Sequence, residues 1–135
     1  MPTTQPLGEN GYLQVRVNTA SGALTVPGAT VIISTRRADG EAGTVLYSTI
    51  TDESGLTPKF SLSAPPASFS NTPDGPAPYL EYEVRVEKPM YFPMIYEGVP
   101  IFEKITTEQP VQLLPVPEGM SNPKPRVFPA YSDRQ

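Results

Sequence analysis

The chain contains neither histidine nor cysteine, and this limits its chemistry more than any other feature. Histidine is the side chain that titrates near neutral pH, and it is the commonest protein ligand for transition metals. Without these two residue types, Ser-His-Asp triads, Cys-His pairs and His- or Cys-based zinc sites are excluded. A Ser-Lys pair would need a lysine beside a buried serine, and nothing around Lys59 or Lys88 predicts one. We therefore expect a non-catalytic protein with no cofactor and no bound metal.

Acidic side chains alternate along one segment, at Glu81, Glu83 and Glu87. Paired carboxylates on one face could support glycoside hydrolysis. Alternating acids on a strand are more typical of its solvated side, so we expect these three to face water.

Two turns also carry acids, Asp39 and Glu41 in one and Asp52 and Glu53 in the other. They could share a calcium ion if the turns lay at the same end of the domain. Calcium takes six to eight closely spaced oxygen ligands, and neither turn has that density. We expect Asp52 to cap its own turn instead, with Gly55 supplying a positive φ.

Aromatic residues gather between positions 79 and 102. The cluster consists of Tyr79, Tyr82, Tyr91, Phe92, Tyr96 and Phe102. Exposed as a strip, these rings could stack on a sugar or a peptide, because tyrosine is enriched in binding patches. The alternative is that most of them fill the core. The candidate ligand-binding residues are Tyr79, Tyr91 and Tyr96.

Proline accounts for 18 of the 135 residues and is concentrated in a loop at 64–78 and in the last twenty residues. Segment 123–129 resembles the polyproline segments that dock on partner proteins. Val127, Phe128 and Tyr131 are the candidate partner-binding residues of this tail, which could equally be a plain linker.

The hydrophobic pattern predicts a single all-β sandwich of about seven antiparallel strands, transthyretin-like or immunoglobulin-like in type. Alternation is clearest at 12–17 and 79–87. Further strands are expected at 29–35, 44–51, 56–62, 91–102 (as two short strands) and 111–114. The predicted domain spans 11–115, between a flexible lead-in at 1–10 and an extended Pro-rich tail at 116–135.

The net charge of −4 argues against nucleic acid, which is bound through clustered Lys and Arg. No apolar run approaches the ~20 residues that span a bilayer. The first residues lack the basic and apolar segments of a signal peptide. We therefore expect a cytoplasmic protein without a membrane span.

Five segments occur in an order that resembles the carboxypeptidase-regulatory-like family, which has a transthyretin-like (prealbumin-like) sandwich. They are GYLQVRV at 11–17, PGATVII at 27–33, TDESGL at 51–56, YEVRV at 82–86 and PMYFP at 89–93. Met90 stands where the family has glycine. The resemblance implies an accessory sandwich without the zinc-protease half.

Two weaker resemblances concern context. Residues 87–91 are similar to the Glu segment of collagen-adhesin B-type repeats, but Arg16 stands where the cross-linking lysine should be, so no isopeptide bond is expected. Segments 98–102 and 109–115 resemble small proteins of clostridial spore-formers that occur near peptidoglycan-binding and spore-cortex-lytic proteins. This implies a bacterial protein associated with the spore or the cell envelope.

The leading functional hypothesis is a non-catalytic binding or assembly module whose partner is a protein or a cell-wall polysaccharide. The alternative is a carbohydrate- or peptidoglycan-binding module that uses exposed tyrosines. An enzyme comes third.

Overall fold

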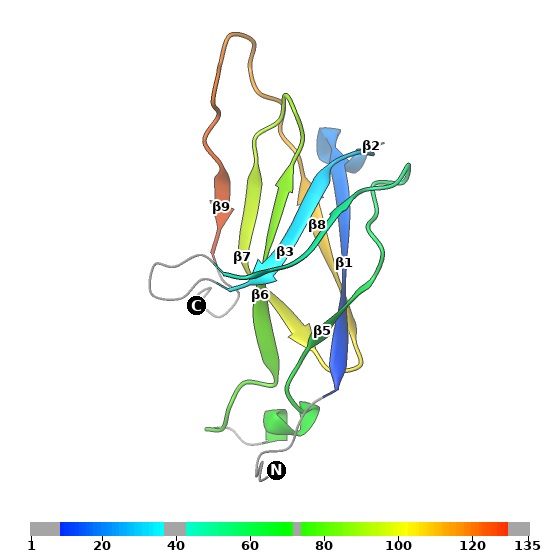
Figure 1. Cartoon of the computed structure of the whole chain (residues 1–135), viewed down its shortest axis with the longest axis vertical. Helices are drawn as coiled ribbons and strands as arrows, with labels where there is room; N and C mark the ends of the chain where they lie inside the picture. The colour runs from blue at the N-terminus through cyan, green and yellow to red at the C-terminus, as the bar shows by residue number, and fades with distance from the viewer. Residues whose placement is uncertain (1–8, 37–42, 72–73, 130–135) are drawn as a thin grey trace.

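Two β-sheets packed face to face make up the protein in a computed structural model, which describes residues 9–36, 43–71 and 74–129 (Figure 1). The strands run roughly along the long axis, and the β7–β8 turn lies at the same end as the start of β1. In the described ranges, no helix is long and apolar enough to cross a membrane.

The first sheet is built around its longest strand, β1 (Asn10–Thr19). This strand pairs antiparallel with β2 and β5 and parallel with β8. The bounds are β2 (Leu24–Thr25), β5 (Phe60–Ser63) and β8 (Thr106–Gln112), and a short 3₁₀ turn, η1 (Ala20–Gly22), follows β1.

The second sheet has the strand order β4-β3-β6-β7-β9. All its neighbouring pairs are antiparallel except β7 and β9, which run parallel. The bounds are β3 (Thr30–Thr35), β4 (Val45–Ile50), β6 (Tyr79–Glu87), β7 (Met94–Phe102) and β9 (Arg126–Phe128), and η2 (Ala67–Asn71) lies in the Pro-rich loop.

The all-β sandwich predicted from the sequence is confirmed, but its strands are not purely antiparallel. The described residues form nine strands rather than about seven. The chain crosses from β7 in one sheet to β8 in the other, so β8 does not return beside its predecessor as a hairpin strand would. It therefore meets β1 in parallel orientation, Tyr12 pairing with Thr106 and Asn18 with Gln112.

The core lies between the sheets and follows the alternation seen in the sequence. Leu13, Val15 and Val17 of β1 are fully buried, because every second side chain of a strand points to the same face. Val84 and Val86 of β6 face them from the second sheet and are equally buried.

A β-bulge explains why residues 91–102 do not form two short strands. Tyr82 pairs with Val99 while Val84 pairs with Tyr96, so one residue of β6 stands opposite two of β7. The extra residue shifts the alternation. As a result Met94 and Val99 are both buried, and β7 runs on to Phe102.

The acids of β6 do not all face water as expected. Glu83 is buried, at 5% exposed. The side chain of Glu81 is 7% exposed and forms an ion pair with Arg36 at the end of β3. Arg36, which directly follows the neighbouring strand β3, thus covers part of the face of β6 that the alternation predicted to be solvated.

The turn at residues 52–55 is capped as the sequence predicts. One carboxylate oxygen of Asp52 accepts hydrogen bonds from the amides of Ser54 (2.8 Å) and Leu56 (3.0 Å). Gly55 has a φ of +76°, and its carbonyl accepts a 2.7 Å bond from the Val17 amide. Asp39 and Glu41, the other half of the calcium hypothesis, lie outside the described residues.

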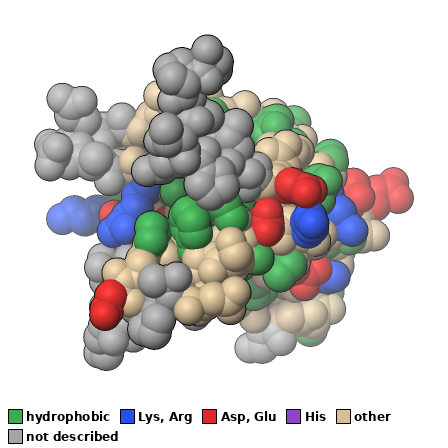
Figure 2. Space-filling view, turned by 90° about the horizontal axis from the view of Figure 1, so that it is seen from below, with side chains coloured by type: hydrophobic (Ala, Val, Ile, Leu, Met, Phe, Trp, Pro, Cys, Tyr) green, Lys and Arg blue, Asp and Glu red, His purple; other side chains and the backbone are tan. Residues whose placement is uncertain are grey.

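Glu103 lies in the turn between β7 and β8 and connects three segments of the chain. Figure 2 shows this end of the sandwich, where acidic and basic side chains lie side by side. Its carboxylate accepts hydrogen bonds from the amides of Ala67 (2.6 Å) and Glu9 (3.1 Å). These bonds, Ala67 first, hold the pKa of the Glu103 carboxyl below its ordinary value of 4.5, with help from the charge of Lys104.

We expect the stabilising effect of Glu103 to depend on pH. Because the folded-state pKa is depressed, the stabilisation is present above the unfolded value near 4.5 and is lost as the pH falls through the folded value. Glu103→Gln should lower the melting temperature at pH 7, and the difference from wild type should shrink below pH 4.5. Glu118→Gln, at an exposed position, controls for the change in charge. A difference that stayed constant with pH would contradict this role.

Candidate ligand-binding cleft

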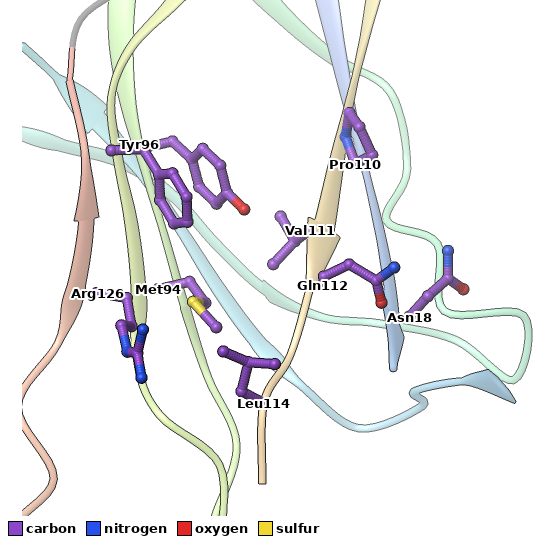
Figure 3. Close-up of a pocket in the computed structure, with 9 residues that line it drawn as sticks. Asn18, Met94, Tyr96, Pro110, Val111, Gln112, Leu114 and Arg126 are labelled. Carbon is purple, nitrogen blue, oxygen red and sulfur yellow. The ribbon is translucent and has the colours of Figure 1, made fainter. Parts of the chain in front are cut away.

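A cavity of about 380 Å³ opens at one side of the sandwich, between the β7–β9 edge of one sheet and the β8 edge of the other. We call it the lateral cleft. Its lining comes from both sheets, as Figure 3 shows: β7 and β9 form one wall, and β8 with the end of β1 forms the other. The lining residues are Asn18, Met94, Tyr96, Pro110, Val111, Gln112, Leu114, Arg126 and Phe128.

The β7–β9 wall carries a stacked pair of aromatic rings. Tyr96 and Phe128 are register partners in the parallel pairing of β7 and β9. Their ring centroids are 4.4 Å apart, and the ring planes differ by only 4°. The thioether of Met94 lies on the same wall. Flat rings and a polarizable sulfur make this wall suited to another planar apolar group.

The opposite wall is apolar with a polar rim. Val111 and Leu114 point toward Tyr96 and supply the apolar part, whereas the amide side chains of Gln112 and Asn18 lie farther out, beyond β8 in Figure 3. The Tyr96 hydroxyl points across the cleft toward this wall. Burial raises the pKa of this hydroxyl and outweighs the opposing hydrogen bond with the backbone of Gln112. Tyr96 is therefore a neutral hydrogen-bonding group at neutral pH.

Arg126 is the charged residue of the lining. Its guanidinium carbon lies 4.8 Å from the ring centroid of Phe92, in a cation–π contact. Among the described residues no carboxylate forms an ion pair with it. β9 is held in place by a 2.8 Å hydrogen bond from the Arg126 amide to the Pro93 carbonyl and by its pairing with β7.

The candidate residues from the sequence are distributed over several places. Tyr96 and Phe128 meet in the lateral cleft. Tyr91 lines a neighbouring cavity of about 460 Å³ that shares Gln112 and Leu114 with the cleft. Tyr79 packs on Phe102 at the far end of β7, with ring centroids 5.3 Å apart. Val127 is 53% exposed, and Tyr131 lies outside the described residues.

Sequence reasoning missed Arg126, Gln112 and Asn18 as cleft residues. Asn18 and Gln112 are the last register partners in the parallel pairing of β1 with β8. Local alternation does not reveal that the two strands run parallel. Arg126 stood in the Pro-rich tail beside Lys124 and looked like part of a scattered basic pair. The available signal of a short strand was a β-branched residue followed by an aromatic one, Val127 and Phe128, between two prolines.

The architecture is similar to that of solved dioxygenases. Catechol 1,2-dioxygenase from Acinetobacter sp. ADP1 matches with a TM-score of 0.54 and 12% identity, covering 94% of this chain and 60% of the enzyme. 3-Chlorocatechol 1,2-dioxygenase from Rhodococcus opacus 1CP matches with a TM-score of 0.51 and 12% identity, covering 86% of this chain and 64% of the enzyme. The chain shares its fold with these enzymes. It spans less than two thirds of the length of either.

The comparison of sequences adds no closer relative. No protein-family model matches the chain, and no curated protein matches it in sequence. The comparisons therefore support the predicted sandwich fold, and they do not assign the chain to a family.

This comparison corrects the functional expectation. A non-catalytic binding or assembly module was expected because the chain lacks histidine and cysteine, but the two solved proteins described above, which share its fold, are enzymes. The absence of these two residue types excluded particular mechanisms and did not identify the scaffold as non-enzymatic. The expectations of a non-catalytic module, and of a carbohydrate-binding one, are wrong on this ground.

The residues of the cleft do not fit a metal centre of the usual oxygenase type. Non-haem iron oxygenases commonly hold iron with two histidines and one carboxylate. The chain has no histidine, and the cleft lining contains no carboxylate. In the described part of the chain, no three Asp or Glu side chains lie close enough to share an ion.

Proposed function

We propose that this domain takes a small aromatic compound of the catechol type into the lateral cleft. The observation that carries this is the stacked wall of Tyr96 and Phe128 along a cavity of about 380 Å³. Ligand cavities in proteins are roughly 300–1,000 Å³, and one of roughly 150 Å³ already admits benzene. A single ring with small substituents suits this volume.

The shape of the cleft favours a flat ligand over a globular one. Its walls come from two sheets, with rings on one side and the side chains of Val111 and Leu114 on the other. A ring inserted between them would bury both of its faces against apolar atoms, and offset stacking of aromatic rings adds about 0.5–1.5 kcal/mol beyond the area buried.

The polar groups of the cleft suit ring hydroxyls. The amides of Gln112 and Asn18 each offer a donor and an acceptor, and the neutral Tyr96 hydroxyl offers both as well. Such groups, few and at the rim of an apolar site, orient a ligand in a cavity of this kind. The names of the two enzymes that share the fold, which refer to catechol and 3-chlorocatechol, are consistent with this ligand class.

Calorimetric titration with catechol tests the proposal, with cis-cyclohexane-1,2-diol as a ligand of similar size that lacks the aromatic ring. Wild type should bind catechol and not the saturated diol. Phe128→Ala removes one ring of the wall and should weaken catechol binding by about 2- to 12-fold.

Tyr79→Ala is the matched control for that titration. It also removes one ring of an aromatic pair on the second sheet, but far from the cleft. Its catechol affinity should equal that of wild type, while melting curves show that both variants remain folded. Equal binding of the two diols, or equal loss in the two variants, would overturn the proposal.

We also propose that the chain belongs to the carboxypeptidase-regulatory-like family. The capped turn at Asp52, the positive φ of Gly55 and the full burial of Ala29 support it, since these are the positions at which the family motifs make structural demands. An association with the cell envelope or the spore, a cytoplasmic location and a protein or polysaccharide partner stay predictions from the sequence.

A further inference from the structure

We infer that the aromatic ligand of the lateral cleft is an acid, and that Arg126 binds its carboxylate. This rests on the proposed function and adds the chemical class of the ligand. The described lining holds one charged side chain, and that side chain is a guanidinium. A cleft with one cation and no carboxylate in its lining favours an anion over a neutral or cationic compound.

The contact of Arg126 with Phe92 leaves hydrogen-bond donors available. The guanidinium carbon lies over the Phe92 ring, 4.8 Å from the ring centroid. The ring occupies one side of the guanidinium, which has five N–H donors in its plane. Two parallel donors match the two oxygens of a carboxylate.

The described carboxylates do not compete for those donors. The ion pairs of the described residues involve Arg16, Arg36, Arg85 and Lys104, and none involves Arg126. The domain as a whole carries a charge of −4, so its general field repels anions. Any electrostatic gain in the binding of an acid must therefore come from the local charge of Arg126. Removing that charge should have a measurable effect on the binding of an acid.

β9 places this cation and one of the stacking rings on the same strand. Arg126 and Phe128 are two residues apart, so both side chains project from the same face of β9 into the cleft. A ring that stacks at Phe128 and bears a carboxylate would reach Arg126 along the direction of the strand. Small benzoate-type acids have this arrangement of ring and charge.

Three probes separate the ring from the charge in calorimetric titrations of the full chain. Benzoate has both, benzamide has the ring without the charge, and cyclohexanecarboxylate has the charge without the aromatic ring. We expect benzoate to bind at least about tenfold more tightly than benzamide, because hydrogen bonds between ionised groups are about twice as strong as neutral ones.

Arg126→Gln should abolish the preference for benzoate over benzamide, because benzoate binding should fall much further than benzamide binding. Lys124→Gln makes the same change in net charge two residues earlier, outside the lining, and should keep the preference. Raising the salt concentration should weaken benzoate binding more than benzamide binding.

The outcomes distinguish this inference from the proposed function. If benzoate and benzamide bind equally well to wild type, or if the preference survives in Arg126→Gln, the acid is not recognised by Arg126 and the inference is overturned, while aromatic binding stands. If cyclohexanecarboxylate binds as well as benzoate, or if no aromatic probe binds, including catechol, the proposed function itself fails.

Discussion

Replacing Ile101 by alanine is expected to lower the free energy of unfolding by about 2–5 kcal/mol. Ile101 is fully buried on β7, where it belongs to the core between the sheets. Its side chain packs against the backbone of Gly11 at the start of β1, so closely that a Cβ on Gly11 would collide with it. Truncation leaves a cavity at this contact, and β-strands cannot shift to fill it without breaking their pairing.

Urea unfolding measures this effect, with Ile105→Ala as the matched control. Ile105 is 54% exposed in the turn after β7, and surface truncations usually change stability by less than about 0.5 kcal/mol. Ile101→Ala should lower the unfolding midpoint without changing the m-value. Equal effects of the two substitutions would mean that the core does not lie where the structure places it.

The second large effect is expected for Gly55→Ala, which should lower the free energy of unfolding by about 2–5 kcal/mol. Gly55 has a φ of +76°, a conformation that costs an L-residue roughly 1–2 kcal/mol. A Cβ there would also lie within 3.0 Å of the Val17 carbonyl oxygen, a separation that real Cβ atoms essentially never show. That carbonyl accepts the Val26 amide (3.0 Å), and leaving this buried pair unsatisfied adds about 1–3 kcal/mol.

Gly119→Ala separates the two contributions in Gly55→Ala. Gly119 has a similar φ of +84°, but nothing lies within 4 Å of the position its Cβ would take. Gly119→Ala should therefore lose only the stability that the unfavourable backbone conformation costs. Thermal melts should show a larger drop in melting temperature for Gly55→Ala than for Gly119→Ala. If Gly119→Ala proved as damaging as Gly55→Ala, contact with Val17 would not be the cause.

Local patterns predicted the strands whose faces differ sharply in polarity. β1 and β6 alternate cleanly, and their apolar residues are buried as expected. The capped turn at Asp52 was also predictable, because an aspartate followed by glycine three residues later satisfies its own backbone. These features depend on neighbours in the sequence, so the sequence reveals them.

Features that depend on distant pairing were not predictable. β8 contains Val111 as its one buried residue. Its sequence therefore shows no hydrophobic alternation from which its length or its parallel pairing with β1 could be predicted. β9 lies in a Pro-rich tail and is only three residues long. Burial of Glu83 depends on the surroundings of β6 in the folded sheet and not on the alternation along that strand.

The cleft illustrates the same limit. Tyr96 and Phe128 were both singled out, one for an aromatic strip and the other for a docking tail, but their stacking needs β9 beside β7. Arg126 gains its position only through the same pairing. The sequence indicated Tyr96 and Phe128 as side chains with binding chemistry, and the fold brought these two together with Arg126.

The most direct test of aromatic binding in the lateral cleft is an NMR titration of the ¹⁵N-labelled chain with catechol. We expect the amide shifts to concentrate at residues 94–96, 111–114 and 126–128, on both walls of the cleft. Amides around Leu46 and Ser61, on the opposite open side of the sandwich, should stay in place. Shifts centred on that opposite side, or none at saturating catechol, would contradict the account.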